Sequence, residues 1–387
     1  MNNFTYCVPT QIRFGKGQIA CLAEELSKYG QNVLMVYGGG SIRRSGLYDQ
    51  IHHLLKDFRV CELGGITPNP KITAVREGVA ICRAHKIDVI LAVGGGSCID
   101  AAKNIACGAF YEGDPWDLVT DGSRITKALP IAVVLTVSAT GSEMNNNAII
   151  SNEETHEKLG IVSDTLYPAL SICDPTYLYT LPGRQTAAGT ADIMSHVIEQ
   201  YFQSYDGAYI TDRLCESVLR TCIHYCPIAL EHPDDYEARS NLMWASTLGL
   251  NHILTLGKGG AWSCHPMEHE LSAYYDVTHG EGLAVLTPAW MSYVLGEQTV
   301  SRFAMYARNV WDIYEKDKYR AAYMGIKRTR EFFNACGLPD TLLRLGIGRE
   351  RFEEMAAEAV RTSGIATRSY VHLQKEDIVK IFDSCAV

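Results

Sequence analysis

The residues most suggestive of chemistry in this sequence are one aspartate and four histidines, which stand in two short runs. In the run TAAGTADIMSHVIEQYFQ, Asp192 and His196 stand four residues apart, so a helix places both side chains on one face. The run AWSCHPMEHELSAYYDVTHGEGLAVL holds His265, His269 and His279, and the first two again share a helical face. A closed metal site uses four ligands, so one of these five residues has another role. Spacing alone does not decide which.

The composition of this set indicates the kind of metal. One carboxylate with several imidazoles suits Zn²⁺ or Fe²⁺, whereas Ca²⁺ and Mg²⁺ prefer oxygen ligands. Taken alone, the Asp192 and His196 pair would by default be a helix cap or an ion pair. The three further histidines within fifteen residues favour the metal, because buried histidines need partners at both ring nitrogens. We predict that His224, His232 and His252, which have no companions at ligand spacing, are helix-surface or core residues.

Two glycine-rich turns predict phosphate binding. The stretch DVILAVGGGSCIDAAKNIA reads as a strand, then Gly94-Gly95-Gly96-Ser97, then a helix. Glycines let the backbone approach a phosphate closely, and the helix N-terminus supplies unpaired N–H groups. Gly38-Gly39-Gly40-Ser41 follows another strand in the same way, although neither run matches GxGxxG. A tight βα turn without a ligand is the alternative for each run taken singly.

A third polar run, from Thr136 to Glu143, follows the strand IAVVLT. Its hydroxyls suit phosphate oxygens, although an ordinary capped turn has the same composition. The second glycine run is followed by Arg43 and Arg44 and carries no acidic residue at the strand end, where an NAD site usually has one for the ribose 2′-hydroxyl. A 2′-phosphate would be tolerated there and could pair with either arginine. Solvated arginines on a first helical turn are the alternative.

The elements that must position these residues change character along the chain. Apolar β-rich runs at 32–37, 58–63, 88–93 and 131–137 alternate with amphipathic segments such as 71–86, which predicts a parallel sheet with crossover helices. After Pro182-Gly183 the pattern becomes helical. We therefore predict an α/β, Rossmann-like nucleotide-binding domain over 1–182 and an all-α metal-binding domain over 183–387. The clearest helical segments of the second half are 209–230, 236–254, 300–314 and 318–335.

Composition limits the class of partner. The chain has 387 residues, of which 47% are hydrophobic and 20% charged, with a formal net charge of −9. A negative surface argues against nucleic acid and anionic lipid and favours a small molecule. No apolar run is long enough to cross a bilayer, and the first residues lack a signal-peptide pattern. Thirteen cysteines without CxxC spacing fit reduced, mostly buried thiols, so we expect a cytoplasmic protein.

Taken together, these motifs resemble the iron-containing, or group III, alcohol dehydrogenases, in particular their NADPH-dependent butanol dehydrogenase and aldehyde reductase branch. The resemblance runs over nearly the whole chain. It is carried by YGGGSIRRSG, GGITPNP, LAVGGGSCIDAAKNIA, ATGSEMNNNAIIS, EKLG, DPTYLYTLP, the Asp192 and His196 segment, and HPMEHELSAYYDVTHGEGLA. It implies a nucleotide-binding α/β domain followed by a helical metal domain.

The resemblance also implies roles for single residues. The ligands of one Fe²⁺ or Zn²⁺ ion would be Asp192, His196, His265 and His279. His269 would lie near the nicotinamide and relay or orient a proton. The residues implied to contact the dinucleotide are Gly38, Gly39, Ser41, Asn69, Gly95, Gly96, Ser97, Asp100, Thr136, Ser142 and Lys158. The glycine at position 38, where NADH-using branches often have an aspartate, favours NADP(H) over NAD(H).

The implied activity is the interconversion of small aldehydes and primary alcohols by hydride transfer, with the metal as Lewis acid. Relatives are commonly dimers or larger assemblies, often joined by pairing of an N-terminal strand. We expect a homodimer here, in which FTYCVPTQIRFG would be that strand. The chain departs from the family pattern at Gly260-Ala261-Trp262. Relatives commonly have an aspartate just before this tryptophan. The alternatives are a polyol dehydrogenase or a dehydroquinate-synthase-like enzyme of the same fold, a metal-dependent hydrolase, and a non-catalytic metal-binding protein. A hydrolase would leave the glycine-rich turns unexplained, and a non-catalytic protein would have no use for the cofactor and metal sites together.

Overall fold

The computed structural model describes residues 1–204 and 207–387. The chain divides into two compact units. One consists of Cys7–Leu181 and Pro233–Thr247, and the other of Met1–Tyr6, Pro182–His232 and Leu248–Val387. This division differs from a single cut at residue 182 in two segments, because the first six residues join the helical unit and residues 233–247 join the nucleotide unit.

The first unit is built on a six-stranded, all-parallel sheet with the strand order β1-β8-β5-β4-β2-β3. Every residue of the central strand β4 is buried, as expected for a parallel strand covered on both faces. The predicted strands at 32–37, 58–63, 88–93 and 131–137 are β2, β3, β4 and β5. The strands are β1 Gln11–Phe14, β2 Asn32–Tyr37, β3 Arg59–Leu63, β4 Val89–Gly94, β5 Ile131–Leu135 and β8 Leu170–Cys173.

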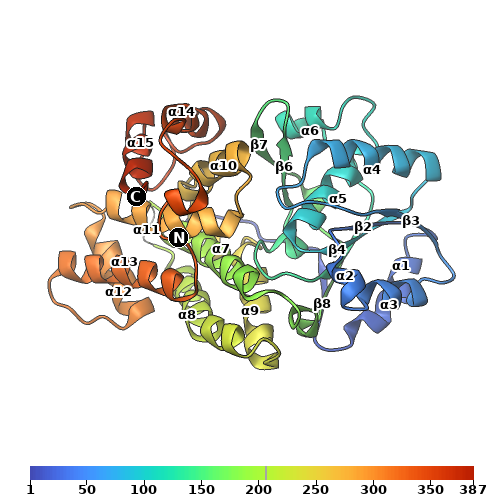
Figure 1. Ribbon diagram of the computed structural model, residues 1–387, viewed down its shortest axis with the longest axis horizontal. Helices are drawn as coiled ribbons and strands as arrows, with labels where there is room; N and C mark the ends of the chain where they lie inside the picture. The colour runs from blue at the N-terminus through green and yellow to red at the C-terminus, as the bar shows by residue number, and fades with distance from the viewer. Residues whose placement is uncertain (205–206) are drawn as a thin grey trace. The chain divides into compact units, whose positions relative to one another are not determined.

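Helices cover both faces of this sheet (Figure 1). Alternate residues of β2 point to opposite faces, so Leu34 and Val36 pack with one apolar cluster, which includes α4 and α5. Val33 and Met35 pack with the other cluster, on the side of α1 and α3. The predicted α/β fold is thereby confirmed. The helices are α1 Leu22–Ser27, α2 Ser41–Arg44, α3 Leu47–Leu54, α4 Ile72–His85, α5 Gly96–Gly108 and α6 Trp116–Thr120.

A two-stranded antiparallel sheet interrupts the alternation of strand and helix. Its strands are β6 Asn147–Asn152 and β7 Glu157–Val162. The sequence interpretation did not include this hairpin. The polar and glycine residues in NAIISN and EKLGIV weaken the strand pattern, because Asn, Glu, Lys and Gly are depleted in strands.

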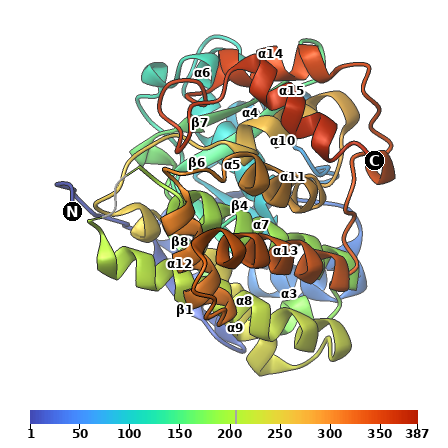
Figure 2. The same ribbon diagram turned by 90° about the vertical axis from the view of Figure 1, so that its left-hand side faces the viewer.

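The second unit is built from helices, and Figure 2 looks onto them. Helix α7 is buried along nearly its whole length, from Thr186 to Tyr201, and packs against α8 and α11. A helix that is buried on all sides belongs to the centre of its unit. In this unit α12 packs on α8, α10, α13 and α15 pack on α11, and α14 packs on α10. Most of α9 lies within residues 233–247 and belongs to the first unit. The helices of the second half of the chain are α7 Gly183–Tyr201, α8 Tyr209–Glu231, α9 Tyr236–Gly249, α10 Cys264–Tyr275, α11 His279–Tyr293, α12 Val300–Trp311, α13 Lys318–Ala335, α14 Phe352–Thr362 and α15 Lys375–Ser384.

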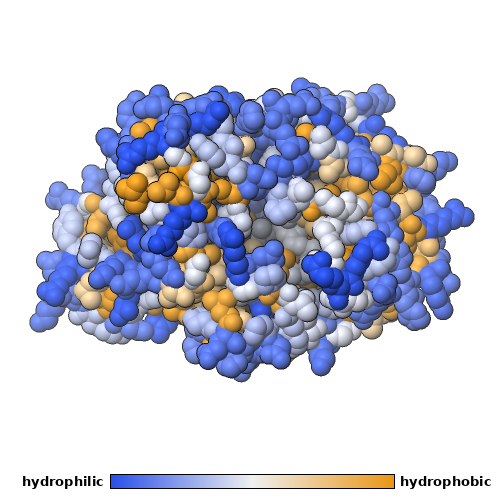
Figure 3. Space-filling model, viewed as in Figure 1, coloured by the Kyte–Doolittle hydropathy of each residue, from blue (hydrophilic) through white to orange (hydrophobic). Residues whose placement is uncertain are grey.

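Hydrophilic side chains cover most of the face shown in Figure 3, and apolar ones form separate small groups. Among residues 1–204 and 207–387, no helix combines the length and the apolar character that spanning a bilayer requires.

All thirteen cysteines carry free thiols. Most are buried, among them Cys222 and Cys226 on α8.

Candidate metal and nucleotide sites

Three helices bring the predicted metal ligands together. Asp192 and His196 lie on α7, His265 on α10, and His279 is the first residue of α11. The Oδ1 atom of Asp192 lies 3.4 Å from His196 Nδ1, 3.8 Å from His265 Nε2 and 3.7 Å from His279 Nε2. Ligand atoms of Asp192, His265 and His279 all lie within 4.8 Å of one another. The ring of His196 stacks on that of His265, with centroids 4.4 Å apart.

A close approach between two helices places His279. A Cβ on Gly280 would lie only 2.0 Å from the backbone oxygen of Ala188 on α7. Only glycine therefore lets the N-terminal turn of α11 come this near to α7. The sequence places that glycine directly after the predicted ligand.

Three atoms of the cluster have no hydrogen-bond partner among the described residues, although they are buried. They are Asp192 Oδ1, His196 Nδ1 and His265 Nε2. Buried polar atoms without a partner are rare and costly, because they lose their bonds to water. A carboxylate oxygen and two imidazole nitrogens that converge in this way form a donor set that fits Zn²⁺ or Fe²⁺.

Burial and mutual attraction perturb the pKa values of this cluster. Burial opposes the charge of Asp192, but the histidines around it, His196 first, hold its pKa well below the usual range. Burial lowers the pKa of His196 to about 3 despite the neighbouring Asp192. For His265 burial also opposes the charge, yet the carboxylate of Glu199 and then that of Asp192 raise its pKa to about 9.

His269 lies beside the cluster. Its ring centroid is 5.7 Å from that of His279 and 6.5 Å from that of His265, and its ligand atom groups with those of Glu268 and His279. His269 thus lies one helical turn after His265. Its proton-relay role stays a prediction.

The aromatic residues near the motif differ in placement. Trp262 lies against the ligands, with its ring 4.5 Å from that of His265 and 5.5 Å from that of His196. Tyr274 and Tyr275, at the C-terminal end of α10, interact with charged residues near the start of α14. The ring of Tyr274 lies 5.2 Å from the guanidinium of Arg351. Burial raises the pKa of Tyr275, and the nearby Glu350 raises it further.

Two glutamates that the sequence interpretation missed contact the ligand histidines. The carboxylate of Glu199 on α7 contacts His265 Nδ1, and that of Glu268 on α10 contacts His279 Nδ1. A signal for the first was present, because Glu199 stands seven residues after Asp192 and so lies on the same helical face. No comparable local signal pairs Glu268 with a residue of another helix.

The predicted nucleotide residues gather at one edge of the parallel sheet. Strands β5, β4 and β2 are neighbours, so the segments after their carboxyl ends lie side by side. These segments hold Gly38, Gly39 and Ser41 after β2, Gly95, Gly96 and Ser97 after β4, and Thr136 after β5. A Cβ on Gly96 would lie 2.5 Å from Thr140 Cγ2, so only glycine allows α5 to begin against that loop.

Asp100, Ser142 and Lys103 form a buried network beneath this edge. The carboxylate of Asp100 accepts bonds from Ser142 Oγ at 2.6 Å and from the Ile149 backbone N–H at 3.1 Å. Lys103 Nζ donates to Ser142 Oγ and to backbone and side-chain oxygens of Asn145, each at 2.9 Å. Burial lowers the pKa of Lys103 to about 8. The network holds the segment after β5 against α5.

The other predicted nucleotide residues lie nearby in the same unit. Asn69, in the loop after β3, is buried and has a φ of 51°, a left-handed conformation that Asn adopts more readily than most residues. Lys158 is buried on β7 and acts electrostatically on Asp100. A direct contact of any of these residues with a dinucleotide stays a prediction.

Family comparisons agree with this arrangement. Residues 9–175 match the family described as iron-containing alcohol dehydrogenase, and residues 186–386 match the C-terminal part of the same family. The chain belongs to the iron-containing alcohol dehydrogenase family. Within this family it is 55% identical to the NADH-dependent butanol dehydrogenase A of Clostridium acetobutylicum over 99% of both chains.

Two further members of the family extend the comparison. The chain is 40% identical to the NADPH-dependent aldehyde reductase YqhD of Escherichia coli, over 90% of both chains. The crystal structure of NADH-dependent butanol dehydrogenase A from Thermotoga maritima matches with a TM-score of 0.96 and 40% identity, covering 100% of this chain and 99% of that one. The family implies a divalent metal and a nicotinamide cofactor. The names of its members specify NADH for some and NADPH for others.

Proposed function

We propose that this protein interconverts small aldehydes and primary alcohols, of which butanal and butanol are representative, with a nicotinamide cofactor and one divalent metal. The observation that carries the proposal is the convergence of unpartnered atoms of Asp192, His196 and His265 beside His279. The names of the similar enzymes, butanol dehydrogenases and an aldehyde reductase, support the same reaction.

Each residue of the cluster has a distinct part in the proposed reaction. When bound, the metal supplies Lewis acidity toward a carbonyl oxygen and the nicotinamide supplies a hydride. Asp192, His196, His265 and His279 hold the metal. His269, which lies beside His279, delivers the proton that the product alcohol oxygen requires. The indole of Trp262 forms an apolar wall against His196 and His265, which suits an alkyl chain.

We assign NADP(H) as the preferred cofactor from the surroundings of the turn after β2. Arg44 Nη1 lies 3.0 Å from the point that a Cβ on Gly40 would occupy, so its guanidinium lies over the glycine run. Arg44 is exposed and has no carboxylate partner in the described part of the chain. It is therefore available to a 2′-phosphate.

Arg43 is engaged elsewhere. Its Nη2 donates to the Tyr37 hydroxyl at 2.9 Å, and its guanidinium lies 3.7 Å from the ring centroid of Tyr48. Both tyrosine hydroxyls donate to Glu62 at 2.7 Å. A phosphate at Arg43 would meet the Glu62 carboxylate, which lies 3.6 Å from Arg43. Of the two arginines, Arg44 is the one we assign to cofactor selection.

The test is a cofactor and substrate panel on enzyme stripped with a chelator and reloaded with Zn²⁺ or Fe²⁺. Oxidation of NADPH and of NADH is followed with aldehydes of two to eight carbons. We expect activity with butanal only after reloading, and a higher kcat/KM with NADPH. Full activity of the stripped enzyme would contradict the metal proposal, and equal use of NADH would contradict the NADP(H) preference.

We further propose a cytoplasmic homodimer. The free thiols of all thirteen cysteines support a reducing compartment. The strand β1 stands at the edge of the six-stranded sheet, with β8 as its neighbour, and an edge strand is available for pairing with a second chain. Sedimentation equilibrium of the full chain tests the dimer, and a monomer at micromolar concentration would contradict it.

A further inference from the structure

One buried carboxylate joins α7 to the start of α10. The Glu199 side chain is 2% exposed. Its Oε1 accepts the backbone N–H groups of Ser263 and Cys264, the latter at 2.7 Å. Its Oε2 accepts the His265 backbone N–H at 3.1 Å and contacts His265 Nδ1. Three consecutive backbone donors and one ring nitrogen therefore meet a single acceptor.

This contact determines the state of the His265 ring. A carboxylate only accepts hydrogen bonds, so Nδ1 of His265 carries a proton and donates it to Glu199. In the neutral ring, Nε2 then has a free lone pair, and Nε2 is the atom that lies 3.8 Å from Asp192 Oδ1. The backbone bonds hold the same carboxylate, so the orientation of the ring is fixed from two directions.

The second glutamate repeats the arrangement one helix further on. Glu268 on α10 is fully buried. Its Oε2 contacts His279 Nδ1, and its Oε1 accepts the Ser272 hydroxyl. As with His265, the Nε2 atom of His279 is the one that faces Asp192, at 3.7 Å. Each of these two ligands is thus oriented by a carboxylate from a neighbouring helix.

We propose that Glu199 and Glu268 are positioning residues that set the metal affinity of the site. They hold the two rings in the tautomer that presents Nε2 and make those nitrogens better donors. Their negative charges also lie one imidazole away from a bound cation and attract it. The inference rests on the proposed function in one respect, because it takes the Asp192 cluster as the metal site.

The experiment measures metal binding rather than turnover. The full chain is stripped with a chelator, and its affinity for Zn²⁺ is measured by competition with a chromophoric chelator, together with the visible absorption of the Co²⁺ form. Glu268→Gln and Glu199→Gln are compared with the wild type. We expect Zn²⁺ affinity to fall by about 10-fold to 100-fold in each variant, because such carboxylates typically contribute that much. The Co²⁺ spectrum should change as a ring reorients.

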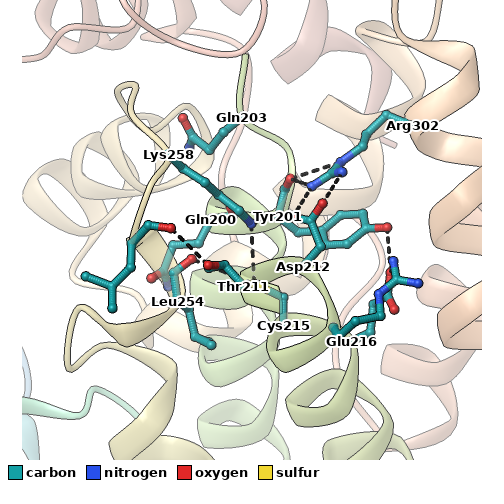
Figure 4. Close-up of polar contacts among 12 residues, drawn as sticks. Gln200, Tyr201, Gln203, Thr211, Asp212, Cys215, Glu216, Leu254, Lys258 and Arg302 are labelled. Atoms are coloured by element: carbon teal, nitrogen blue, oxygen red, sulfur yellow. Dashed lines mark hydrogen bonds and ion pairs between the residues drawn. The ribbon is translucent and has the colours of Figure 1, made fainter. Parts of the chain in front are cut away.

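Glu216 offers a matched control. It is a buried glutamate on α8. Its Oε1 accepts a hydrogen bond from the Tyr201 hydroxyl at 2.8 Å (Figure 4). Its other partners, Arg213 and Asn309, lie outside the Asp192 cluster. Glu216→Gln should lower the melting temperature yet leave Zn²⁺ affinity within about twofold of wild type, since a structural loss alone does not touch the ligands.

Glu268→Gln separates positioning from folding, because the hydrogen bonds that Glu268 makes to Ser272 and His279 involve side chains, whereas Glu199 also accepts three backbone N–H groups. Wild-type affinity in a folded Glu268→Gln variant would overturn the inference even if Glu199→Gln failed to fold. A wild-type chain that does not bind Zn²⁺ would instead overturn the proposed metal site, and this inference with it.

Discussion

The chemistry of this chain depends on which atoms of its histidines are left for a cation. Glu199 and Glu268 occupy Nδ1 of His265 and His279, so the Nε2 atoms face Asp192 Oδ1. His269 stands one turn further along α10 and groups with Glu268 and His279 instead. Residues of the same type in one short motif thus have different roles because their partners differ.

Substitution of single histidines should separate these roles. We expect His265→Ala and His279→Ala each to lose bound metal and activity together, because three remaining ligands hold a metal less tightly than four. His269→Ala should retain the metal while kcat falls by about 100-fold, the size typical of a lost proton-transfer group. Elemental analysis of the purified variants is the measurement. Metal loss in the His269 variant, with retention in the His265 variant, would reverse the assignment.

The two arginines after β2 should differ in their effect on cofactor choice. We expect Arg44→Ala to weaken NADPH binding about 10-fold, equivalent to about 1.4 kcal/mol, and to leave NADH binding unchanged. Arg43→Ala is the matched control, because Arg43 is engaged by Tyr37 and Tyr48. Titration of cofactor fluorescence measures both dissociation constants. A larger loss of NADPH selectivity in the Arg43 variant would transfer the role to that residue.

At the scale of elements, the nucleotide site depends on how the segment after β5 is held. The glycine turns follow from local sequence, but the third segment, from Thr136 to Asn146, has no regular structure except the short 3₁₀ turn Ser142–Met144. Its position depends on α5, from which Asp100 and Lys103 bind Ser142 and Asn145. Helix α5 therefore has two functions, since its first turn borders the predicted phosphate site and its next turn anchors the loop.

Removing the ammonium group of this network should destabilise the nucleotide unit. We expect Lys103→Met to lower the free energy of unfolding by on the order of 3 kcal/mol, because buried acceptors and the Asp100 carboxylate lose their partner. Lys56→Met, at an exposed position, should change it by less than about 0.5 kcal/mol. Urea titrations of both variants provide the comparison. Equal stability of the two would show that Lys103 contributes no net stabilisation.

At the scale of the whole molecule, each unit draws on segments distant in sequence. Residues 233–247 belong to the nucleotide unit because Thr247 donates to Glu143 at 2.6 Å and Trp244 packs edge-on against Phe14. The N-terminal residues belong to the helical unit, where the Asn2 backbone N–H donates to the Gly257 oxygen at 3.0 Å. The order of segments along the chain is therefore not the order of the units.

The dependence of rate on substrate length tests the proposed reaction in the intact protein. Burial of each CH₂ group is worth about 0.8 kcal/mol, so kcat/KM should rise about fourfold for each carbon that the enzyme removes from water. Aldehydes of about three to six carbons should exceed acetaldehyde, and reduction should be favoured at neutral pH because alcohol oxidation releases a proton. Steady-state kinetics over the series gives the slope. A higher kcat/KM for glycerol or a sugar phosphate than for butanal would contradict this preference.

Features that arise locally could be predicted from the sequence. The strands at 32–37 and 88–93, the helix near 71–86, the glycine turns and the helical pairing of Asp192 with His196 all depend on residues within a few positions of one another, whose periodicity and backbone preferences are visible in one window. Spacing also brought out the five candidate ligands, although it could not rank them.

Contacts between groups that are distant in the sequence could not be predicted and became visible in the folded chain. Glu199 and His265 are 66 residues apart, Asp100 and Ser142 are 42 apart, and Glu143 and Thr247 are 104 apart. The hairpin of β6 and β7 and the membership of residues 233–247 likewise depend on packing. Buried polar groups must find partners wherever the packed chain brings donors and acceptors together, and that choice is a property of the folded molecule rather than of any stretch of sequence.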